Sequence, residues 1–429
     1  MRNETSVERA IARAFRPRRR ISRRDFLRQS GRGAVIAGSA LTLPSILAAC
    51  GIGPSASGGS PAASSGGGLV GGGELALMLN FANWPLYIDQ DEDTGESATL
   101  AQFEEETGID VEYTEAIQDN QEFFGTIQPA LTAGQDTGWD MIVPTDWMVG
   151  KMIGLGYLAE FDVAASVPNF VANAADVYKD PTYDPGNRHS VPWQSGITGI
   201  AYNPELTGRE ITGFADLLDP AFSGRIGMFT EVRDTASLAL LHNGVVPADA
   251  TEDDVRAAMD VLRDQAPLVR GYYGNEYAQE LANGSLAVTM AWSGDVFQLQ
   301  FDNPDLQFIV PEAGGILWID NMTIPKGAQH PNDALAFMDF VFRPEIAAQI
   351  TEYVNYICPV PAAQEIILTH AQEAADGGDQ ETADYLTSVA ESELVFPSDE
   401  MLSQVHSYKV LSEEEEELWN TLFQEITQG

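Results

Sequence analysis

The stretch that decides the fold is 311–325, which reads P-E-A-G-G-I-L-W-I-D-N-M-T-I-P. Its middle alternates as a β-strand does, so Trp318 and Asp320 are expected on one face and Leu317 and Ile319 on the other. An indole beside a carboxylate can hold an organic cation, because the ring face attracts positive charge and the carboxylate pairs with an ammonium group. Alone, the pair is more typical of a core tryptophan and a hydrogen-bonded aspartate. The functional interpretation therefore depends on similar pairs elsewhere in the chain.

Strand and helix patterns alternate along the rest of the chain. The first strand pattern, 74–81, ends directly before an aromatic loop at 83–87, N-W-P-L-Y. Ligands of open α/β sheets bind just outside the carboxyl ends of strands, so this loop is a candidate binding site. The succession predicts an α/β fold with a mostly parallel sheet. The predicted elements are strands at 109–113, 139–143, 196–202, 224–229 and 286–291 and helices at 99–107, 119–133, 234–242, 251–263, 332–342, 344–350 and 412–426.

The N-terminus carries export signals. Residues 22–28 read S-R-R-D-F-L-R, a twin-arginine pattern, and a run of small apolar residues follows at 34–49. This run is too short and glycine-rich for a membrane span, so a permanent anchor is the weaker alternative. It ends in a lipobox-like L-A-A-C-G, with Cys50 as the lipidated residue. We therefore predict a twin-arginine lipoprotein signal at 1–49, a flexible tether at 50–73, and a location at the periplasmic or extracellular face of the cytoplasmic membrane.

Charge is distributed very unevenly. Residues 1–49 contain 11 of the 23 basic and 3 of the 64 acidic residues, so the remainder has 12 basic and 61 acidic side chains and a net charge of −49. Such a surface excludes nucleic acid and anionic lipid as partners. A solvated acidic surface that suits high salt explains the charge better than a trap for cations, and the run 413–417 is assigned to an exposed helix face. Cys358 has no partner once Cys50 is lipidated, so no internal disulfide is expected.

Several short motifs together resemble one family. They are Asn83-Trp84-x-x-Tyr87, Trp139-Asp140-x-Ile142-Val143-Pro144-Thr145-x-Trp147, Val191-Pro192-Trp193, Thr230-Glu231-Val232-Arg233-Asp234, Ala291-Trp292-Ser293-Gly294, the stretch 314–325 and Tyr356-x-x-Pro359. In this order they resemble the polyamine-binding (spermidine/putrescine) proteins of bacterial ABC importers, over nearly all of 74–360. The resemblance implies a two-lobed periplasmic-binding-protein fold, type II-like, with the ligand in the cleft between the lobes. It also implies a monomer without cofactor or metal, which does no chemistry on its ligand and delivers it to permease subunits.

Lobe boundaries and a binding site follow from the same resemblance. Lobe 1 is expected to comprise 74–192 and about 318–360, and lobe 2 to comprise 193–317 and about 361–429. The cleft is expected to hold aromatic walls, carboxylates and one small hydroxyl group, which map by motif to Trp84, Tyr87, Thr145, Trp147, Glu231, Asp234, Trp292, Trp318, Asp320 and Tyr356. Trp193 is expected in the core instead.

Two positions depart from the family pattern. Leu86 stands where some members have a glutamate, and Trp147 replaces a more usual tyrosine. Each bears on how a terminal amine is held or on the length of the cleft, so the choice among putrescine, spermidine and related amines stays open. No residue of this sequence could be matched to the glutamine contact that the family has near its C-terminus.

The residue types suit a polyamine on physical grounds, and three alternatives stay open. A polyamine alternates apolar carbon with ammonium groups, and enclosing an unpaired ammonium is costly, so its site needs flat walls interrupted by acids. A carboxylate-dependent glycoside hydrolase is the remote alternative, since acids are abundant but no hydrolase, zinc or P-loop motif occurs. Asp89-x-Asp91-x-Asp93 begins like a calcium loop but departs from it at the glycine and the final glutamate, so an acidic surface loop is expected there. Another organic cation or ferric iron is the remaining alternative ligand.

Overall fold

The computed structural model describes residues 69–91 and 94–428. The predicted signal 1–49, Cys50 and the tether up to residue 68 lie outside these residues, as does Asp93 of the calcium-like loop. Val70, within the range predicted as tether, donates its N–H to the carbonyl of Glu160 at 2.7 Å. Of the helices in the described residues, none combines the length and apolar character needed to cross a bilayer.

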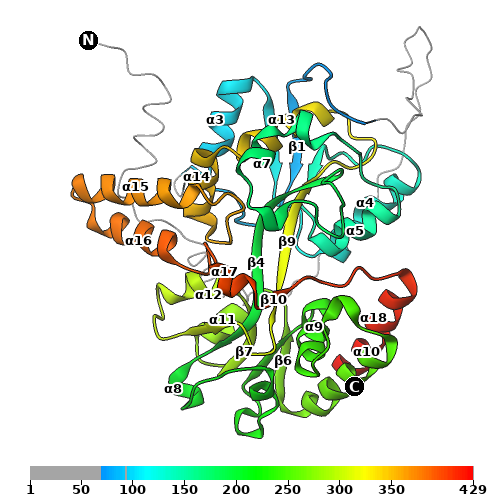
Figure 1. Cartoon of the computed structure of the whole chain (residues 1–429), viewed down its shortest axis with the longest axis vertical. Helices are drawn as coiled ribbons and strands as arrows, with labels where there is room; N and C mark the ends of the chain where they lie inside the picture. Colours follow the sequence, from blue (N-terminus) through cyan, green and yellow to red (C-terminus); the bar gives the residue numbers. More distant parts are fainter. Residues whose placement is uncertain (1–68, 92–93, 429) are drawn as a thin grey trace, which may run out of the picture.

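One sheet runs through the molecule. In the described chain it has ten strands in the order β2-β1-β3-β9-β4-β7-β5-β6, with β10 beside β9 and β8 beside β4. Residues 311–325 supply β9 (Gly315–Thr323), which is buried along its whole length. It pairs with β4 (Ser190–Tyr202), with a register shift between Pro192 and Gln194. These two long strands run from one half of the molecule to the other (Figure 1).

Apart from the short pair of β10 with β9, the parallel pairs of the sheet lie within each half. β1 (Met78–Ala82) pairs in parallel with β2 (Asp110–Thr114) and β3 (Met141–Ile142), and we call the half that contains them the first lobe. In the half that we call the second lobe, β5 pairs in parallel with β6 and β7. The pairs β4–β9, β4–β7 and β3–β9 are antiparallel, because β4 and β9 carry the chain between the lobes in opposite directions. The prediction of a mostly parallel sheet is thus wrong for the crossing strands.

Polar side chains cap the starts of some helices of the first lobe. Asp119 accepts from the N–H of Glu122 at 2.8 Å at the start of α4, as predicted. Ser97 accepts from the N–H of Leu100 in the same way at the start of α3. The helices of this lobe are α3 (Ala98–Thr107), α4 (Asn120–Thr132), α5 (Asp146–Gly154), α6 (Val163–Ser166), α7 (Pro168–Asn173), α13 (Pro331–Val341) and α14 (Pro344–Val354).

In the second lobe, α9 (Val232–His242) begins earlier than predicted. Glu231 is its N-cap and accepts from the N–H of Arg233 at 3.1 Å, which extends the helix toward the end of β5. The other elements of this lobe are β5 (Ile226–Phe229), β6 (Val269–Tyr273), β7 (Val288–Trp292), β8 (Gln307–Ile309), α8 (Pro204–Thr207), α10 (Glu252–Gln265), α11 (Tyr277–Ala282) and α12 (Ser293–Gln300).

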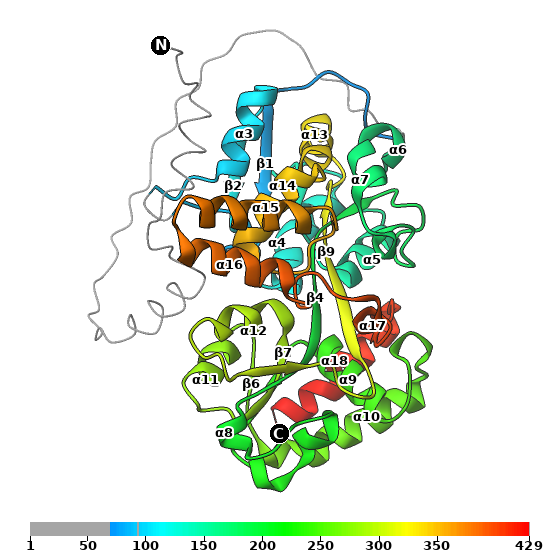
Figure 2. The ribbon, with the colours of Figure 1, turned by 60° about the vertical axis from the view of Figure 1, so that its left-hand side comes forward.

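The C-terminal helices divide between the lobes. α15 (Ala363–Asp376) packs on α14 and on α16 (Gln380–Glu391), beside the first lobe (Figure 2). After α17 (Asp399–Leu402) and β10 (Val405–His406), α18 (Glu413–Thr427) packs on α9 and α10. The lobe boundaries stay a prediction, and these contacts favour placing α15 and α16 with the first lobe rather than the second.

Trp193 lies in the core, as predicted. Its side chain is buried, stacks on Phe337 with ring centroids 6.3 Å apart, and donates from Nε1 to the carbonyl of Tyr87 at 3.0 Å. Cys358 is a buried free thiol. The core contact of Trp193 places the aromatic loop at 83–87 against β4, where the two lobes meet.

Candidate binding site

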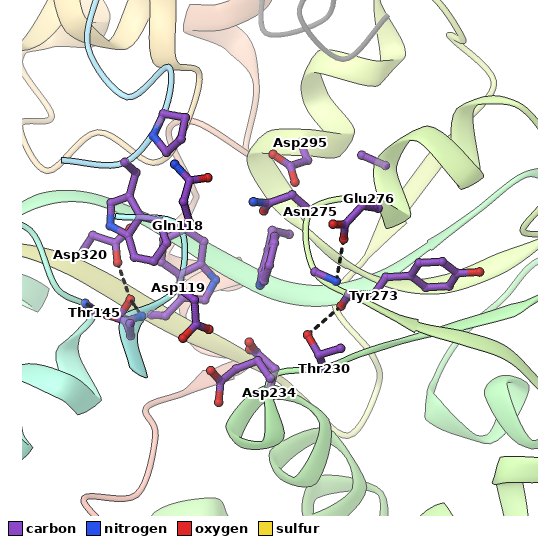
Figure 3. A pocket seen from close by; sticks show the side chains of 18 of the residues that line it. Gln118, Asp119, Thr145, Thr230, Asp234, Tyr273, Asn275, Glu276, Asp295 and Asp320 are labelled. Atoms are coloured by element: carbon purple, nitrogen blue, oxygen red, sulfur yellow. Dashed lines mark hydrogen bonds between the residues drawn. The ribbon is translucent and has the colours of Figure 1, made fainter. Parts of the chain in front are cut away.

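A cleft of about 900 Å³ lies between the lobes and collects all ten predicted site residues. Figure 3 shows Asp320 and Thr145 apart from Asp295 and Glu276, with Asp234 at the start of α9. The lining of the cleft includes Trp84, Tyr87, Thr145, Trp147, Glu231, Asp234, Trp292, Trp318, Asp320 and Tyr356. Residues separated by more than 200 positions in the chain therefore share one surface.

Asp320 is held by two hydroxyl groups of the first lobe. Tyr87 donates from Oη to Asp320 Oδ2 at 2.9 Å, and Thr145 donates from Oγ1 to Oδ1 at 2.7 Å. Thr145 is itself fixed by Asn120, which donates from Nδ2 to its Oγ1 at 2.8 Å. An ionised carboxylate accepts about four hydrogen bonds, so Asp320 retains capacity for further donors while its position is set.

Three aromatic rings of the cleft pack against one another, and one of them belongs to Tyr87, which donates to Asp320. The ring of Tyr356 lies 5.5 Å from that of Trp318 and 5.7 Å from that of Tyr87, centroid to centroid. Trp318 fits because Gly196 of β4 faces it, and a Cβ at that position would overlap the indole. The arrangement confirms that Trp318 and Asp320 share a strand face, which the alternation of β9 predicts.

The second lobe adds Trp292 at the end of β7 and two acids at the start of α9. Trp292 stacks on Phe229 with ring centroids 4.4 Å apart. Burial raises the pKa of Glu231 to about 7; the nearby Arg233 opposes this shift and the Asp234 charge adds to it. Burial likewise raises the pKa of Asp234 to about 6, although Thr198 and Tyr408 donate hydrogen bonds to its Oδ1 at 2.5 Å and 2.6 Å.

A third buried acid stands behind the cleft. Asp146, in the first turn of α5, accepts from the N–H of Trp147 at 2.6 Å. Its pKa is raised well above the usual value, first by burial and then by the charges of Asp320 and Asp234. Carboxylates crowded and desolvated in this way are stabilised in their charged forms by a cation placed among them.

Comparison with known proteins assigns the chain to a family. The sequence profile of the bacterial extracellular solute-binding proteins matches residues 98–377, well over half of the chain. The chain belongs to this family. It is therefore an extracytoplasmic solute-binding protein of a transport system and not an enzyme, in agreement with the motifs.

The relatives of this solute-binding protein include polyamine receptors. The spermidine/putrescine-binding periplasmic protein of Escherichia coli is 28% identical over 290 residues, which cover 67% of this chain and 79% of the relative. The putrescine/agmatine-binding protein of Pseudomonas aeruginosa is 29% identical over 272 residues, covering 59% and 72%. The solved structure of the spermidine/putrescine ABC transporter substrate-binding protein PotD of Streptococcus pneumoniae superposes with a TM-score of 0.67 at 26% identity, covering 82% of this chain and 98% of that one. The predicted resemblance and the two-lobed fold are thereby confirmed.

Sequence reasoning missed several cleft residues of the solute-binding protein. Asp295 lines the cleft and accepts hydrogen bonds from Tyr356 Oη at 2.7 Å and Tyr277 Oη at 2.9 Å. Its position three residues after Trp292 repeats the geometry of Asp234, an acid in a helix that follows a strand, and could have signalled it. Tyr408 reaches the cleft from the chain beyond β10 and carries no local signal, because only the fold brings it to Asp234.

The two departures from the family pattern lie at the cleft wall. Leu86 has a positive φ of 55° and donates its N–H to Glu115 Oε1 at 2.7 Å. Trp147 is 5% exposed, and the guanidinium Cζ of Arg233 lies 3.6 Å from its ring centroid. Trp147 thus already stacks on a cation of the other lobe, a contact that sequence reasoning did not predict.

Proposed function

We propose that this chain binds a linear polyamine of the spermidine/putrescine type in the interlobe cleft and delivers it to the permease of an ABC importer. The observation that supports this most directly is the convergence of Trp84, Trp292 and Trp318 with Glu231, Asp234 and Asp320 in one cleft. Rings and acids come from both lobes, as a ligand made of alternating apolar carbon and ammonium groups requires. The relatives named above bind such amines, which supports the same choice.

The electrostatics of the cleft favour an amine with N–H donors. A tryptophan face over a desolvated cation contributes about 0.5–2 kcal/mol. The carboxylates supply the partners without which an enclosed ammonium is strongly destabilised. Because their spacing selects amines at matching positions, a misplaced amine leaves a buried acid unpaired, and this is how the cleft would discriminate chain length. No feature of residues 69–91 and 94–428 favours another organic cation, ferric iron or a saccharide.

Delivery and location complete the proposal. The pattern at 22–28 supports export by the twin-arginine route, and L-A-A-C-G at 47–51 supports a lipid anchor at Cys50 on the outer face of the cytoplasmic membrane. A monomer that closes on its ligand would present the closed form to the permease subunits, with closure driven by ligand contacts to both lobes.

Calorimetry of the protein without residues 1–49 tests the proposal. Putrescine, spermidine and longer amines are titrated beside betaine and ferric citrate. Heat of binding is expected for at least one linear polyamine and for neither betaine nor ferric citrate. Saturable binding of betaine or ferric citrate, with none for any polyamine, would overturn the assignment.

A further inference from the structure

One face of α5 points across the cleft toward the second lobe. Trp147 and Lys151 are four residues apart on this helix and so lie on the same side of it. Trp147 stacks on the guanidinium of Arg233, which belongs to α9. Lys151 donates from Nζ to Glu416 Oε1 of α18 at 2.9 Å. Two successive turns of α5 therefore each contact the opposite lobe.

The side chain of Glu416 contacts residues of both lobes. Its Oε1 accepts from Lys151 Nζ and, at 3.2 Å, from Gln121 Nε2 of α4, and it lies 3.6 Å from Arg233 Nη2. Lys151 and Gln121 belong to the first lobe, whereas Arg233 belongs to the second. α18 packs on α9 and α10, which ties Glu416 to the second lobe. The sequence pattern placed 413–417 on a solvated face, but the side chain of Glu416 is only 12% exposed.

Arg233 depends on this carboxylate. Its side chain is 4% exposed, and its Nε and Nη1 form no hydrogen bond with any part of the chain that the structure describes. Its other acidic neighbour, Glu231, is 3.9 Å from Nη1 and faces the cleft. A buried guanidinium without partners is strongly destabilised, so Glu416, the Trp147 ring and, at the longer distance, Glu231 keep Arg233 in place.

We propose that Glu416 is a positioning residue for the binding cleft, which joins the two lobes around the ligand through Lys151 and Gln121 and holds Arg233 against Trp147. This rests on the proposed function, because lobe closure matters here as the step that retains a polyamine. Neither Glu416 nor Lys151 lines the cleft, so neither touches the ligand. Separation of the lobes breaks the contacts of Glu416 with Lys151 and Gln121, so these contacts stabilise the closed form selectively and slow ligand release.

The rate of ligand dissociation distinguishes the proposed role of Glu416 from an ordinary contribution to folding stability. In the full mature chain, Glu416→Gln is compared with Glu414→Gln, which removes an exposed charge two residues earlier in the same helix that forms no ion pair within the described residues. Release of putrescine or spermidine, followed by stopped-flow tryptophan fluorescence, is expected to be about tenfold faster in Glu416→Gln, with association changed little. Glu414→Gln should release ligand at the wild-type rate. Wild-type release from Glu416→Gln would overturn the proposal.

A double-mutant cycle shows whether the effect crosses the lobes. Lys151→Met breaks only one of the contacts of Glu416 and should accelerate release by no more than Glu416→Gln does. The double variant should release ligand no faster than Glu416→Gln alone, because the contact of Lys151 with Glu416 is already lost there. Additive effects on the release rate would also overturn the proposal.

An interlobe distance measured without ligand tests the role of Glu416 independently of the proposed function. Distances between labels at Val171 and Val246, two exposed positions in different lobes, report closure directly. Glu416→Gln should shift the population toward longer distances and Glu414→Gln should not. If wild-type protein binds no polyamine, the proposed function fails, yet this shift still tests the role of Glu416; an unchanged distance distribution would contradict it.

Discussion

At the scale of single residues, the cleft acids differ in how they are held. Asp320 accepts two hydroxyl donors from the first lobe, and Asp234 accepts two that reach it from β4 and from the C-terminal segment. Glu231 has one backbone donor and a guanidinium at 3.9 Å. Burial raises the pKa values of Glu231 and Asp234 in the second lobe and that of Asp146 behind the cleft in the first. The position of Asp320 is set from the first lobe by its two hydroxyl donors.

Replacement of Asp320 tests its role in holding an amine. Asp320→Asn should weaken polyamine binding by about 2–4 kcal/mol, because a buried ammonium loses its charged partner. The free energy of unfolding should change much less, since asparagine keeps an acceptor for Tyr87 or Thr145. Calorimetry and urea denaturation measure the two effects. Asp305→Asn, at an exposed position outside the cleft, is the charge control, and an affinity of Asp320→Asn equal to that of this control would remove Asp320 from the site.

Polyamine affinity should fall as the pH is lowered. The pKa of Glu231 is raised to about 7 and that of Asp234 to about 6 in the free protein, and a bound ammonium favours their charged forms. Both groups therefore have lower pKa values in the complex than in the free protein. Binding releases protons at pH values between the pKa of each acid in the complex and its pKa in the free protein. As the pH falls through this range, the affinity for the polyamine decreases by up to about tenfold per pH unit for each group.

Titration calorimetry at pH 6.5 in two buffers of different ionisation enthalpy measures that proton release. Glu231→Gln should reduce the number of protons released. A dissociation constant that stays constant from pH 8 to pH 5 would show that neither acid is coupled to the ligand.

At the scale of elements, the close approach of β4 to β9 shapes the cleft wall. Strand β4 has glycine where Trp318 of β9 lies flat against it. Alternation alone predicts which face of β9 carries Trp318. It does not predict that the paired strand must leave space for the ring, since this depends on the register Gly196↔Trp318.

Gly196→Ala should therefore both destabilise the fold and weaken binding. Overpacking of this kind costs about 1–3 kcal/mol in the free energy of unfolding, and a displaced indole no longer covers the ligand. Urea denaturation and calorimetry give the two values. Gly213→Ala is the matched control, because that glycine is extended at φ −173° and no atom lies within 4 Å of its added Cβ. Equal behaviour of the two variants would contradict the packing argument.

At the scale of the whole molecule, net charge opposes the compact state. The chain after residue 49 has a net charge of −49, and its 12 basic residues can pair with only a fraction of its 61 acids. Repulsion among the remaining surface carboxylates destabilises the folded form and is screened by salt. The interlobe contacts of Glu416 are formed in spite of this general repulsion between lobes.

Stability should accordingly rise with moderate salt. Raising NaCl from 0.01 M to 0.15 M shortens the Debye length from about 30 Å to about 8 Å, which weakens the repulsion at a concentration too low for large effects on hydrophobic burial. The urea midpoint should increase across this range while the m-value stays constant. A midpoint independent of salt would indicate that the acids are paired or too well solvated to repel one another.

The sequence by itself determined the local features of this protein. Periodicity placed a strand within 311–325 and located α10 close to its observed bounds, because the burial of one face imposes a 2.0- or 3.6-residue repeat on neighbouring residues. The capping residue Asp119 marked the start of α4. The resemblance of the ordered motifs to the polyamine-binding family implied ten cleft residues, and all ten line the cleft. Some of them, such as Trp292 at the end of β7 and Glu231 at the start of α9, stand at element ends. Trp318 and Asp320 lie inside β9, where alternation predicts only that they share a face.

Only the tertiary structure decided which distant residues meet. With 61 acids after residue 49, no pattern distinguishes Glu416 from the solvated majority, and nothing local brings Tyr408 to Asp234 or Arg233 to Trp147. The path of α15 and α16 back to the first lobe is likewise a matter of packing. Such contacts depend on the free energy of bringing remote segments together, which neighbouring residues in the chain do not encode.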